Sequence, residues 1–388
     1  MEYIVVRLNY KSSQQISLDD FLFLTDDDFE KKYSNVGFAA PRWQSTATRT
    51  YKVGRASDVF KRNLHINMLI NKLDEFNKAH EDLFSLERQS LYRTFHIPKK
   101  SGGLRRIDAP TAPLMDALRE LKVLFETYFN ALYHTSAFAY VRGRSTIDAV
   151  KKHQNNNSKW FAKFDLSNFF GSTTEEYTMK MLSMVFPFSQ VVKTERGRDV
   201  LRKAISLAFL DGGLPQGTPI SPLITNLIMI PVDYELFNMF RNFNGQKFVY
   251  TRYADDFLVS SEYDFSCAEI EQEIIKCLSS FDAPFNIKKE KTRYGSSAGS
   301  NWNLGIMLNK DNNMTVGYKN KRTFAAMIHS YAMDKLNGKQ WELHDIQVME
   351  GYRNYYRMIE KDAIDAIVTK LDSKLSINVV SMIKEDLR

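Results

Sequence analysis

The chain has 388 residues, 44% of them hydrophobic, and 53 Lys and Arg against 46 Asp and Glu, which gives a net charge of +7. This is an ordinary globular composition, long enough for two or three lobes, and its basic balance favours a polyanionic partner. Its two cysteines, Cys267 and Cys277, exclude a disulfide framework or a cysteine-rich zinc site. Because no apolar stretch approaches the ~18 residues that span a bilayer, and the N-terminus lacks a signal-peptide pattern, we expect a cytoplasmic protein without membrane contact.

Residues 1–88 are predicted to form an N-terminal extension, with a strand at Tyr3–Leu8 and a helix at about Ser57–Ala79. Between Pro41 and Arg62 there are six basic residues against Asp58 alone. Charge runs are usually solvated faces, but this one motivates the hypothesis that the extension binds RNA.

The next segment carries turn and strand signals. From Tyr92 to Pro110 the pattern predicts two short strands joined by a Gly102-Gly103 turn rich in basic residues, followed by a helix at about 114–132. A further strand at about 160–165 ends in Asp165, and a helix is expected at about 175–186. The segment 212–227 is typical of a loop leading into a helix, which gathers backbone N–H groups at one place.

Two adjacent carboxylates, Asp255 and Asp256, lie between two β-branched and aromatic runs, a pattern that predicts strand, tight turn and strand. Unit charges about 4 Å apart repel by roughly 1 kcal/mol in water and about 4 kcal/mol at a protein surface, so a cation is expected there. Mg²⁺ is the natural candidate, because it prefers carboxylate oxygens and shares them with substrate phosphates. Ordinary hairpin-turn chemistry is the alternative, since Asp tolerates unusual turn angles.

The C-terminal part is predicted to be basic and then helical. A helix is expected at about 266–280, and eight basic residues stand against two acids between Asn286 and Ala325. A helix at about 346–375 carries tyrosines at helical spacing, which more often marks a core than a stacking surface.

Three motifs in a fixed order carry a resemblance. They are Phe164-Asp-Leu-x-x-Phe-Phe170, Leu214-Pro-Gln-Gly217 and Tyr253-Ala-Asp-Asp256. Over residues 91–310 the chain resembles the reverse transcriptases, which have an α+β right-hand fold. The resemblance implies fingers at 89–160, a palm with an antiparallel sheet and helices at 161–308, and a helical thumb at 309–388.

The likeness is greatest to bacterial enzymes of retrons, group II introns and phage defence. The strings Ile97-Pro-Lys-Lys-Ser-Gly-Gly-Leu-Arg105 and Arg142-Gly-Arg-Ser145 look retron-like, although the Val-Thr-Gly element of retrons is missing. The resemblance implies an RNA-directed DNA polymerase that copies a dedicated non-coding RNA in antiphage defence. The alternatives are a retron-type enzyme making RNA-linked DNA and a non-enzymatic RNA-binding scaffold.

The resemblance also assigns the catalytic centre. Asp165, Asp255 and Asp256 are its catalytic residues, and with the Leu166 carbonyl they would hold two Mg²⁺ ions, with Mn²⁺ as an alternative ion. The alternative for Asp165 is a helix N-cap.

The substrates implied are dNTPs and an RNA template, with DNA as product. The nucleotide site would contain Arg105, Phe170, Gln216, Gly217 and Lys291. Phe170 would exclude a 2′-hydroxyl, whereas one of Phe169 and Phe170 is expected in the core. Primer and template would contact three further residues, namely Leu304, Gly305 and Arg353.

Overall fold

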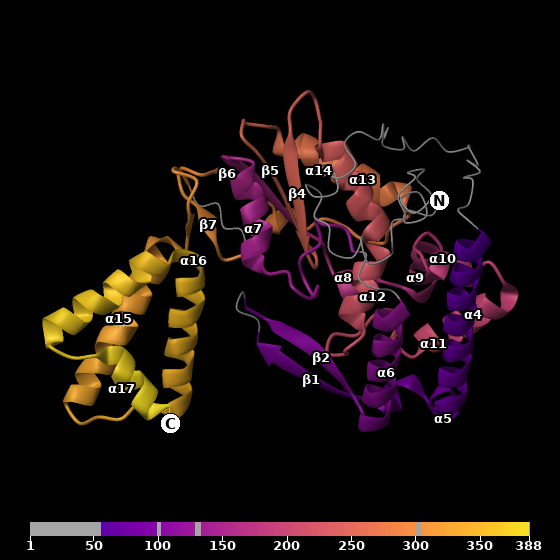
Figure 1. Cartoon of the computed structure of the whole chain (residues 1–388), viewed down its shortest axis with the longest axis horizontal. Helices are drawn as coiled ribbons and strands as arrows, with labels where there is room; N and C mark the ends of the chain where they lie inside the picture. Colours follow the sequence, from indigo (N-terminus) through magenta and orange to yellow (C-terminus); the bar gives the residue numbers. More distant parts are fainter. Residues whose placement is uncertain (1–55, 99–101, 129–132, 300–303, 388) are drawn as a thin grey trace. The chain divides into compact units, whose positions relative to one another are not determined.

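The computed structural model describes residues 56–98, 102–128, 133–299 and 304–387, with the backbone alone at 56–64 (Figure 1). The strand predicted at Tyr3–Leu8 lies outside the described residues. So do the side chains of the basic cluster between Pro41 and Arg62.

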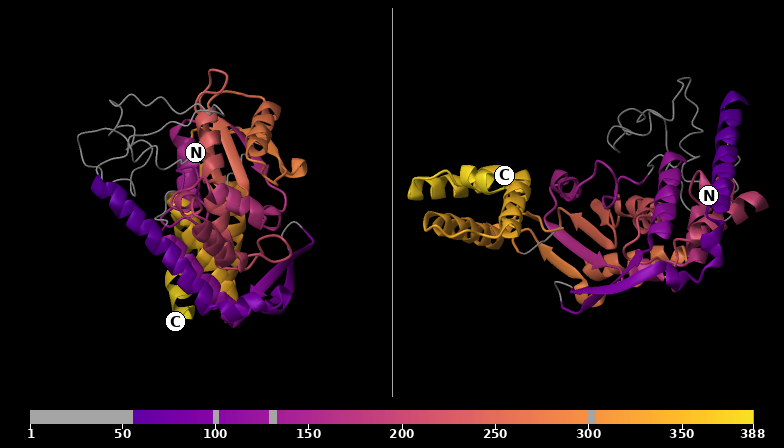
Figure 2. Two further views of the ribbon diagram at one scale, coloured as in Figure 1. Left: turned by 90° about the vertical axis from the view of Figure 1, so that its right-hand side faces the viewer. Right: turned by 90° about the horizontal axis from the view of Figure 1, so that it is seen from below.

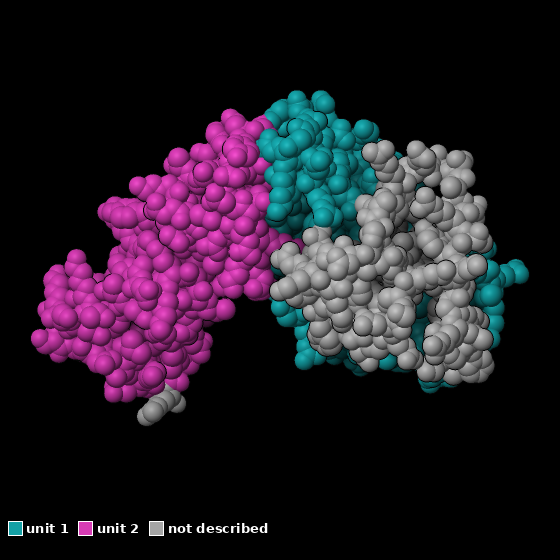
Figure 3. All heavy atoms as spheres, turned by 45° about the horizontal axis from the view of Figure 1, so that its top comes forward, with its two compact units in different colours: residues 1–144, 164–257, 266–292 teal, residues 145–163, 258–265, 293–388 magenta. Residues whose placement is uncertain are grey.

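The chain divides into two compact units (Figure 3). Unit 1 contains residues 1–144, 164–257 and 266–292, and unit 2 contains residues 145–163, 258–265 and 293–388. This division does not separate fingers, palm and thumb from one another, so the four predicted parts and their boundaries stay a prediction.

Unit 1 is built mainly of helices around the long α4 (Ala56–Ala79), which packs against α6, α10 and α11. The Asn77 side chain fixes this packing by donating a hydrogen bond to the carbonyl of Val200 at 2.9 Å. The other helical segments in the described part of the unit are α5 (Glu81–Ser85), η1 (Arg88–Leu91), α6 (Ala112–Tyr128), α8 (Phe169–Ser172), α9 (Glu175–Leu182), α10 (Phe188–Val191), α11 (Glu195–Ser206), α12 (Ser221–Ile228), α13 (Ile230–Phe240), α14 (Cys267–Ser280) and η2 (Lys289–Lys291).

A two-stranded hairpin follows η1. Strands β1 (Tyr92–Pro98) and β2 (Leu104–Pro110) pair antiparallel, with Ile97 opposite Arg105, and the predicted Gly102-Gly103 turn is confirmed. Both glycines have a positive φ, 87° and 80°, which a residue with a Cβ rarely adopts. β1 is exposed from Arg93 to Pro98 and β2 from Leu104 to Arg106, so the side chains near the turn are available to a ligand.

A four-stranded sheet carries the segments of the catalytic motifs. Its order is β4 (Phe248–Tyr253), β5 (Asp256–Ser261), β3 (Trp160–Asp165) and β6 (Arg293–Ser296). Strands β3 and β6 pair antiparallel, with Trp160 opposite Ser296. Because most residues of β4 and β5 are buried, these strands are covered on both faces and hold their connecting turn in place.

Unit 2 has its own core, in which apolar residues of α7 (Thr146–Asn155), α15 (Gly317–Leu336) and α16 (Leu343–Leu375) come together. Helices α15 and α16 run beside each other, and α17 (Val379–Asp386) packs on α16 (Figure 1 and Figure 2). Helix α16 is kinked at Glu360, whose φ of −143° is not helical. The Glu360 carboxylate accepts hydrogen bonds from Thr315 and Lys321, both at 2.7 Å, and so ties the short hairpin β7 (Met307–Leu308) and β8 (Met314–Thr315) to the kink.

The mixture of helices and antiparallel strands confirms the α+β fold class. Among the helices of the described residues, none is both long and apolar enough to cross a membrane. The cytoplasmic location expected from the sequence stays a prediction.

Candidate active site

Backbone hydrogen bonds bring the predicted carboxylates to one place in unit 1. Asp165 ends β3, Asp255 lies in the turn between β4 and β5, and Asp256 begins β5. The Leu166 N–H donates to the Asp255 carbonyl at 3.0 Å, which joins the two strand ends directly. Asp165 does not act as a helix N-cap, because α8 begins only at Phe169.

The other side of Asp165 is closed by the segment before β6. The Lys288 N–H donates to the Asp165 carbonyl at 2.8 Å, and the Ser167 N–H donates to the Asn286 carbonyl at 2.7 Å. The Lys291 ammonium then donates to both carboxylate oxygens of Asp165, each at 3.0 Å. The structure therefore brings Lys291 to the carboxylates, and its predicted contact with the nucleotide stays a prediction.

The charges at this turn conflict with one another. Burial, and then repulsion by Asp256 and Asp165, raise the pKa of Asp255 above its ordinary value of 3.8. The hydrogen bond to Asp165 raises the pKa of Lys291, so this lysine stays charged. Positive charge is thus needed at the carboxylates, and Lys291 supplies part of it.

These residues suit a hard divalent cation, because their donors are carboxylate oxygens crowded by like charge. In the described residues, no three acidic, histidine or cysteine side chains converge as a ready cation cage. Mg²⁺ is usually held by one or two carboxylates together with substrate phosphates. Asp165 and Asp255 are the pair that would hold it, and the predicted contributions of Asp256 and the Leu166 carbonyl stay predictions.

Two adjacent phenylalanines follow Asp165 and have different environments. Phe169 is 2% exposed and packs its ring 4.9 Å from that of Phe285. Phe170 is only partly buried. The expectation that one of the two belongs to the core is confirmed for Phe169, and Phe170 remains available to a substrate.

Phe170 is tied by its backbone to the Leu214-Pro-Gln-Gly217 segment. Its carbonyl accepts a hydrogen bond from the Leu214 N–H at 3.0 Å. Next to this bond the two backbone segments pack closely at Gly171 and Gly213, because a Cβ on Gly213 would lie 2.1 Å from the Gly171 carbonyl oxygen. Only glycine fits there, so the phenylalanine and the loop are held in fixed relation.

The same loop is bound to the β1–β2 hairpin. The Asp108 N–H donates to the Gln216 carbonyl at 2.9 Å. Gly217 has a φ of 120°, and a Cβ on it would approach the Asp108 carbonyl oxygen to 3.1 Å. Close approach of the two backbones therefore requires glycine at 217.

Arg105 lies exposed on β2, next to Arg106. Arg106 pairs with Asp108 at 2.8 Å and with Asp211 at 2.9 Å, which fixes the strand on which Arg105 stands. A planar guanidinium presented in this way suits a triphosphate.

Sequence reasoning missed Tyr140. Its φ is 59°, an unusual value for a bulky residue, and its side chain is 59% exposed. Partial desolvation, and then the nearby charge of Asp255, raise the pKa of Tyr140, whereas Arg105 acts in the opposite direction. Tyr140 is therefore within electrostatic reach of both Asp255 and Arg105.

The residues predicted to contact primer and template belong to unit 2. Leu304 and Gly305 form a turn before β7, with φ values of 57° and 84°. Arg353 is 8% exposed and donates to both carboxylate oxygens of Glu350, at 2.7 and 2.6 Å. Its guanidinium is thus engaged within its own helix, and the predicted contact of Arg353 with primer or template stays a prediction.

Comparison with known proteins gives three findings. A family model described as reverse transcriptase (RNA-dependent DNA polymerase) matches residues 97–323, more than half of the chain. The chain is 26% identical over 300 residues to the Retron Ec83 reverse transcriptase of Escherichia coli, which covers 76% of this chain and 90% of that protein. It is 28% identical over 211 residues to the Retron Ec73 reverse transcriptase of Escherichia coli, covering 53% and 65%.

A solved structure of apo telomerase from Candida Tropicalis is similar with a TM-score of 0.44 and 12% identity, over 78% of this chain and 63% of that one.

Proposed function

The chain belongs to the reverse transcriptase family, the RNA-dependent DNA polymerases, and we propose that its polymerase centre is the carboxylate site of Asp165, Asp255 and Lys291. The observation that carries this proposal is the contact of the Lys291 ammonium with both Asp165 oxygens beside the raised-pKa carboxyl of Asp255. A site with this charge conflict favours the binding of cations and phosphates, which relieve it.

Divalent metal ions, which the family uses, stabilise the attacking and leaving oxygens of an in-line displacement when they are bound. Asp165 and Asp255 would hold these ions, with Mg²⁺ as the proposed species. Lys291 would move from Asp165 toward the leaving pyrophosphate, and would neutralise its negative charge or donate a proton to it.

The substrate is proposed to be a deoxynucleoside triphosphate. Arg105 would bind the triphosphate, and the backbone of Gln216 and Gly217 would lie against the base pair. Phe170 would lie under the sugar, where its ring leaves no room for a 2′-hydroxyl. The product of this chemistry is DNA copied from an RNA template.

We propose a dedicated non-coding RNA as the template and RNA-linked DNA of retron type as the product. The similarity to a retron reverse transcriptase along 90% of that relative supports the proposal. A role in antiphage defence is proposed with it. Sequencing of the nucleic acid that co-purifies with the protein tests the proposal, because one structured RNA joined to its DNA copy is expected. A mixture of unrelated cellular RNAs would contradict it.

Primer extension on an RNA template with Mg²⁺ tests the polymerase site itself. We expect the parent to extend the primer and the double variant Asp255→Ala/Asp256→Ala to lose extension. Equal extension by the two proteins, or none by the parent, would contradict the proposed site.

A further inference from the structure

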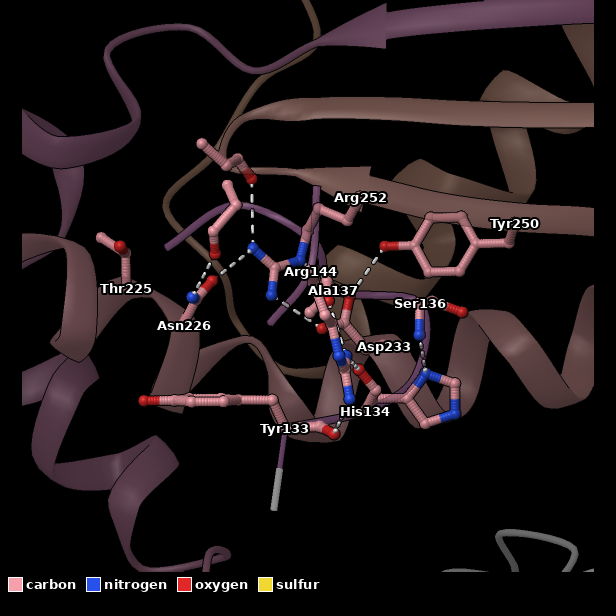
Figure 4. Close-up of polar contacts among 12 residues, drawn as sticks. Tyr133, His134, Ser136, Ala137, Arg144, Thr225, Asn226, Asp233, Tyr250 and Arg252 are labelled. Atoms are coloured by element: carbon pink, nitrogen blue, oxygen red, sulfur yellow. Dashed lines mark hydrogen bonds and ion pairs between the residues drawn. The ribbon is translucent and has the colours of Figure 1, made fainter. Parts of the chain in front are cut away.

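Beneath the catalytic turn lies a cluster of charged and polar side chains that takes no part in the proposed chemistry. Arg252 of β4 is 1% exposed and Asp233 of α13 is fully buried. The Arg252 guanidinium donates from Nε and Nη2 to the two carboxylate oxygens of Asp233, each at 2.8 Å, and Tyr250 donates to the same carboxylate at 2.9 Å. Figure 4 shows the guanidinium between Asp233 and Asn226.

One nitrogen of Arg252 remains for other partners. Nη1 donates to the Ala254 carbonyl at 3.2 Å and to Oδ1 of Asn226 at 3.1 Å. Ala254 directly precedes Asp255 and has a φ of 56°, in the left-handed region that alanine rarely adopts. The buried guanidinium therefore holds a strained residue next to a catalytic carboxylate.

Asn226 extends the same cluster to a second strained residue. Its Nδ2 donates to the Ala139 carbonyl at 2.7 Å, directly before Tyr140, whose φ is 59°. The segment is also fixed to β4 itself, because the Arg252 N–H donates to the Ser136 carbonyl at 2.7 Å and the Phe138 N–H donates to the Arg252 carbonyl at 2.9 Å. Strained backbone persists only where its surroundings over-determine it, and such strain concentrates at functional sites.

We propose that Arg252, Asp233 and Asn226 form a buried clamp that positions the catalytic turn and the Tyr140 segment relative to each other. Arg252 and Asn226 are positioning residues, since neither lies among the residues proposed to touch the nucleotide. Asp233 keeps the guanidinium charged and oriented, because a buried charge needs a paired partner. The clamp rests on the proposed polymerase site and adds to it the means by which Asp255 and Tyr140 keep their spacing.

The test uses Asn226→Leu in the full chain, which removes both of the side-chain hydrogen bonds of Asn226 without touching a charge. Thr225→Val is the matched control. Thr225 is the adjacent buried residue of α12, and its hydroxyl donates only to the Pro222 carbonyl of its own helix, at 3.0 Å. Figure 4 shows Thr225 outside the hydrogen-bonded cluster.

Single-nucleotide addition to a primer on an RNA template is measured for each protein across a Mg²⁺ series, together with the melting temperature and folded fraction. For Asn226→Leu we expect kcat per folded molecule to fall about tenfold, since small misplacements of reacting groups reduce rates steeply. We also expect the Mg²⁺ concentration at half-maximal rate to rise several-fold. Thr225→Val is expected to match the parent in both measurements.

If Asn226→Leu does not fold, Asn226→Ser takes its place, because the shorter hydroxyl cannot reach both Arg252 and Ala139. A rate per folded molecule and a Mg²⁺ profile equal to those of Thr225→Val would overturn the clamp. The parent and Asp255→Asn are assayed alongside. A parent that is inactive, or that is no more active than Asp255→Asn, would count against the polymerase site, whereas an active parent with an unaffected Asn226 variant would count against the clamp alone.

Discussion

Arg252 and Asp255 belong to one hairpin, three residues apart, yet their charges have opposite surroundings. The charge of Arg252 is wholly buried and fully compensated by Asp233. The charge of Asp255 faces two other carboxylates, and burial and repulsion raise its pKa. The charge of Arg252 is paired within the protein, which keeps the hairpin rigid. The charge of Asp255 is only partly compensated, and a substrate with its cations would supply the missing positive charge. Five predictions test this difference between the buried clamp and the catalytic turn.

The largest effect is expected at Asp165. Asp165→Asn keeps the shape of the side chain but removes the charge that would bind a metal ion, so primer extension should fall about 1000-fold or more. The folded fraction, followed by circular dichroism, should not change. A rate within tenfold of the parent would mean that the turn is not the polymerase centre.

The same kind of substitution in the clamp, Asp to Asn at Asp233, should instead lower the free energy of unfolding. Asp233→Asn leaves the Arg252 guanidinium buried without its counter-charge, and we expect the free energy of unfolding to fall by about 3–5 kcal/mol. Urea denaturation measures it. A loss below about 1 kcal/mol would show that water reaches Arg252, and the contrast between the two regions would disappear.

Phe170→Ala should change the choice of sugar. Removal of the ring opens space for a 2′-hydroxyl, and we expect discrimination against ribonucleotides to fall by about 10–200-fold in ratios of kcat/KM. Phe169→Leu is the control, because Phe169 is buried in the core and should affect stability alone. Equal discrimination by the two variants would remove Phe170 from the nucleotide site.

Lys291 and Lys288 provide a matched pair of lysines at the turn. The Lys291 ammonium lies 3.0 Å from Asp165 Oδ2, whereas that of Lys288 lies 3.7 Å from Oδ1. Lys291→Met should lower kcat about tenfold, since a charged donor near the leaving group is lost. On a logarithmic scale, Lys288→Met should lower kcat by less than half as much as Lys291→Met does. Equal losses would point to general electrostatic attraction.

The smallest effect is a gain in stability. Asp255→Asn removes repulsion from Asp165 and Asp256, and without Mg²⁺ the free energy of unfolding should rise by about 1 kcal/mol. Because the folded protein holds the Asp255 proton more tightly than the unfolded chain, this carboxyl stabilises the fold below its ordinary pKa of 3.8. That contribution is lost as pH rises from 3.8 through the raised pKa. The variant should lack this pH-dependent loss, and an unchanged pH profile would contradict the prediction.

The sequence predicts the strands and turns of the catalytic hairpin well, because its β-branched and aromatic runs and the Asp-Asp turn are local signals. It also places Asp165, Asp255 and Lys291 in one site through their motifs. The clamp was missed, although its signal is present in the sequence. Asp233 and Arg252 stand inside apolar runs, so each must be paired if buried. One sequence cannot say that they are partners, since their pairing depends on how α13 packs on β4.

Arg353 differs from the clamp, because its sequence context and its contacts in the fold point in different directions. Its position among tyrosines on a predicted thumb helix suggests a phosphate contact, and only the folded helix reveals that Glu350 occupies its guanidinium. Tyr140 was missed for a similar reason. A left-handed φ has no sequence signal when the residue is tyrosine, because the strain comes from contacts made elsewhere in the chain.

The contact of Gly213 with the Gly171 carbonyl oxygen has a consequence for protein engineering. A Cβ on Gly213 would collide with the Gly171 carbonyl oxygen and so separate Phe170 from the Leu214-Pro-Gln-Gly217 loop, whereas a Cβ on Gly171 would first meet the Asn168 side chain. The proposed sugar contact of Phe170 and the proposed base-pair contact of Gln216 are therefore coupled through the backbone. Libraries that aim at new nucleotide substrates should keep Gly213 fixed and vary Phe170 together with Gln216, because a change at one of these two residues alone leaves the residue coupled to it unadapted.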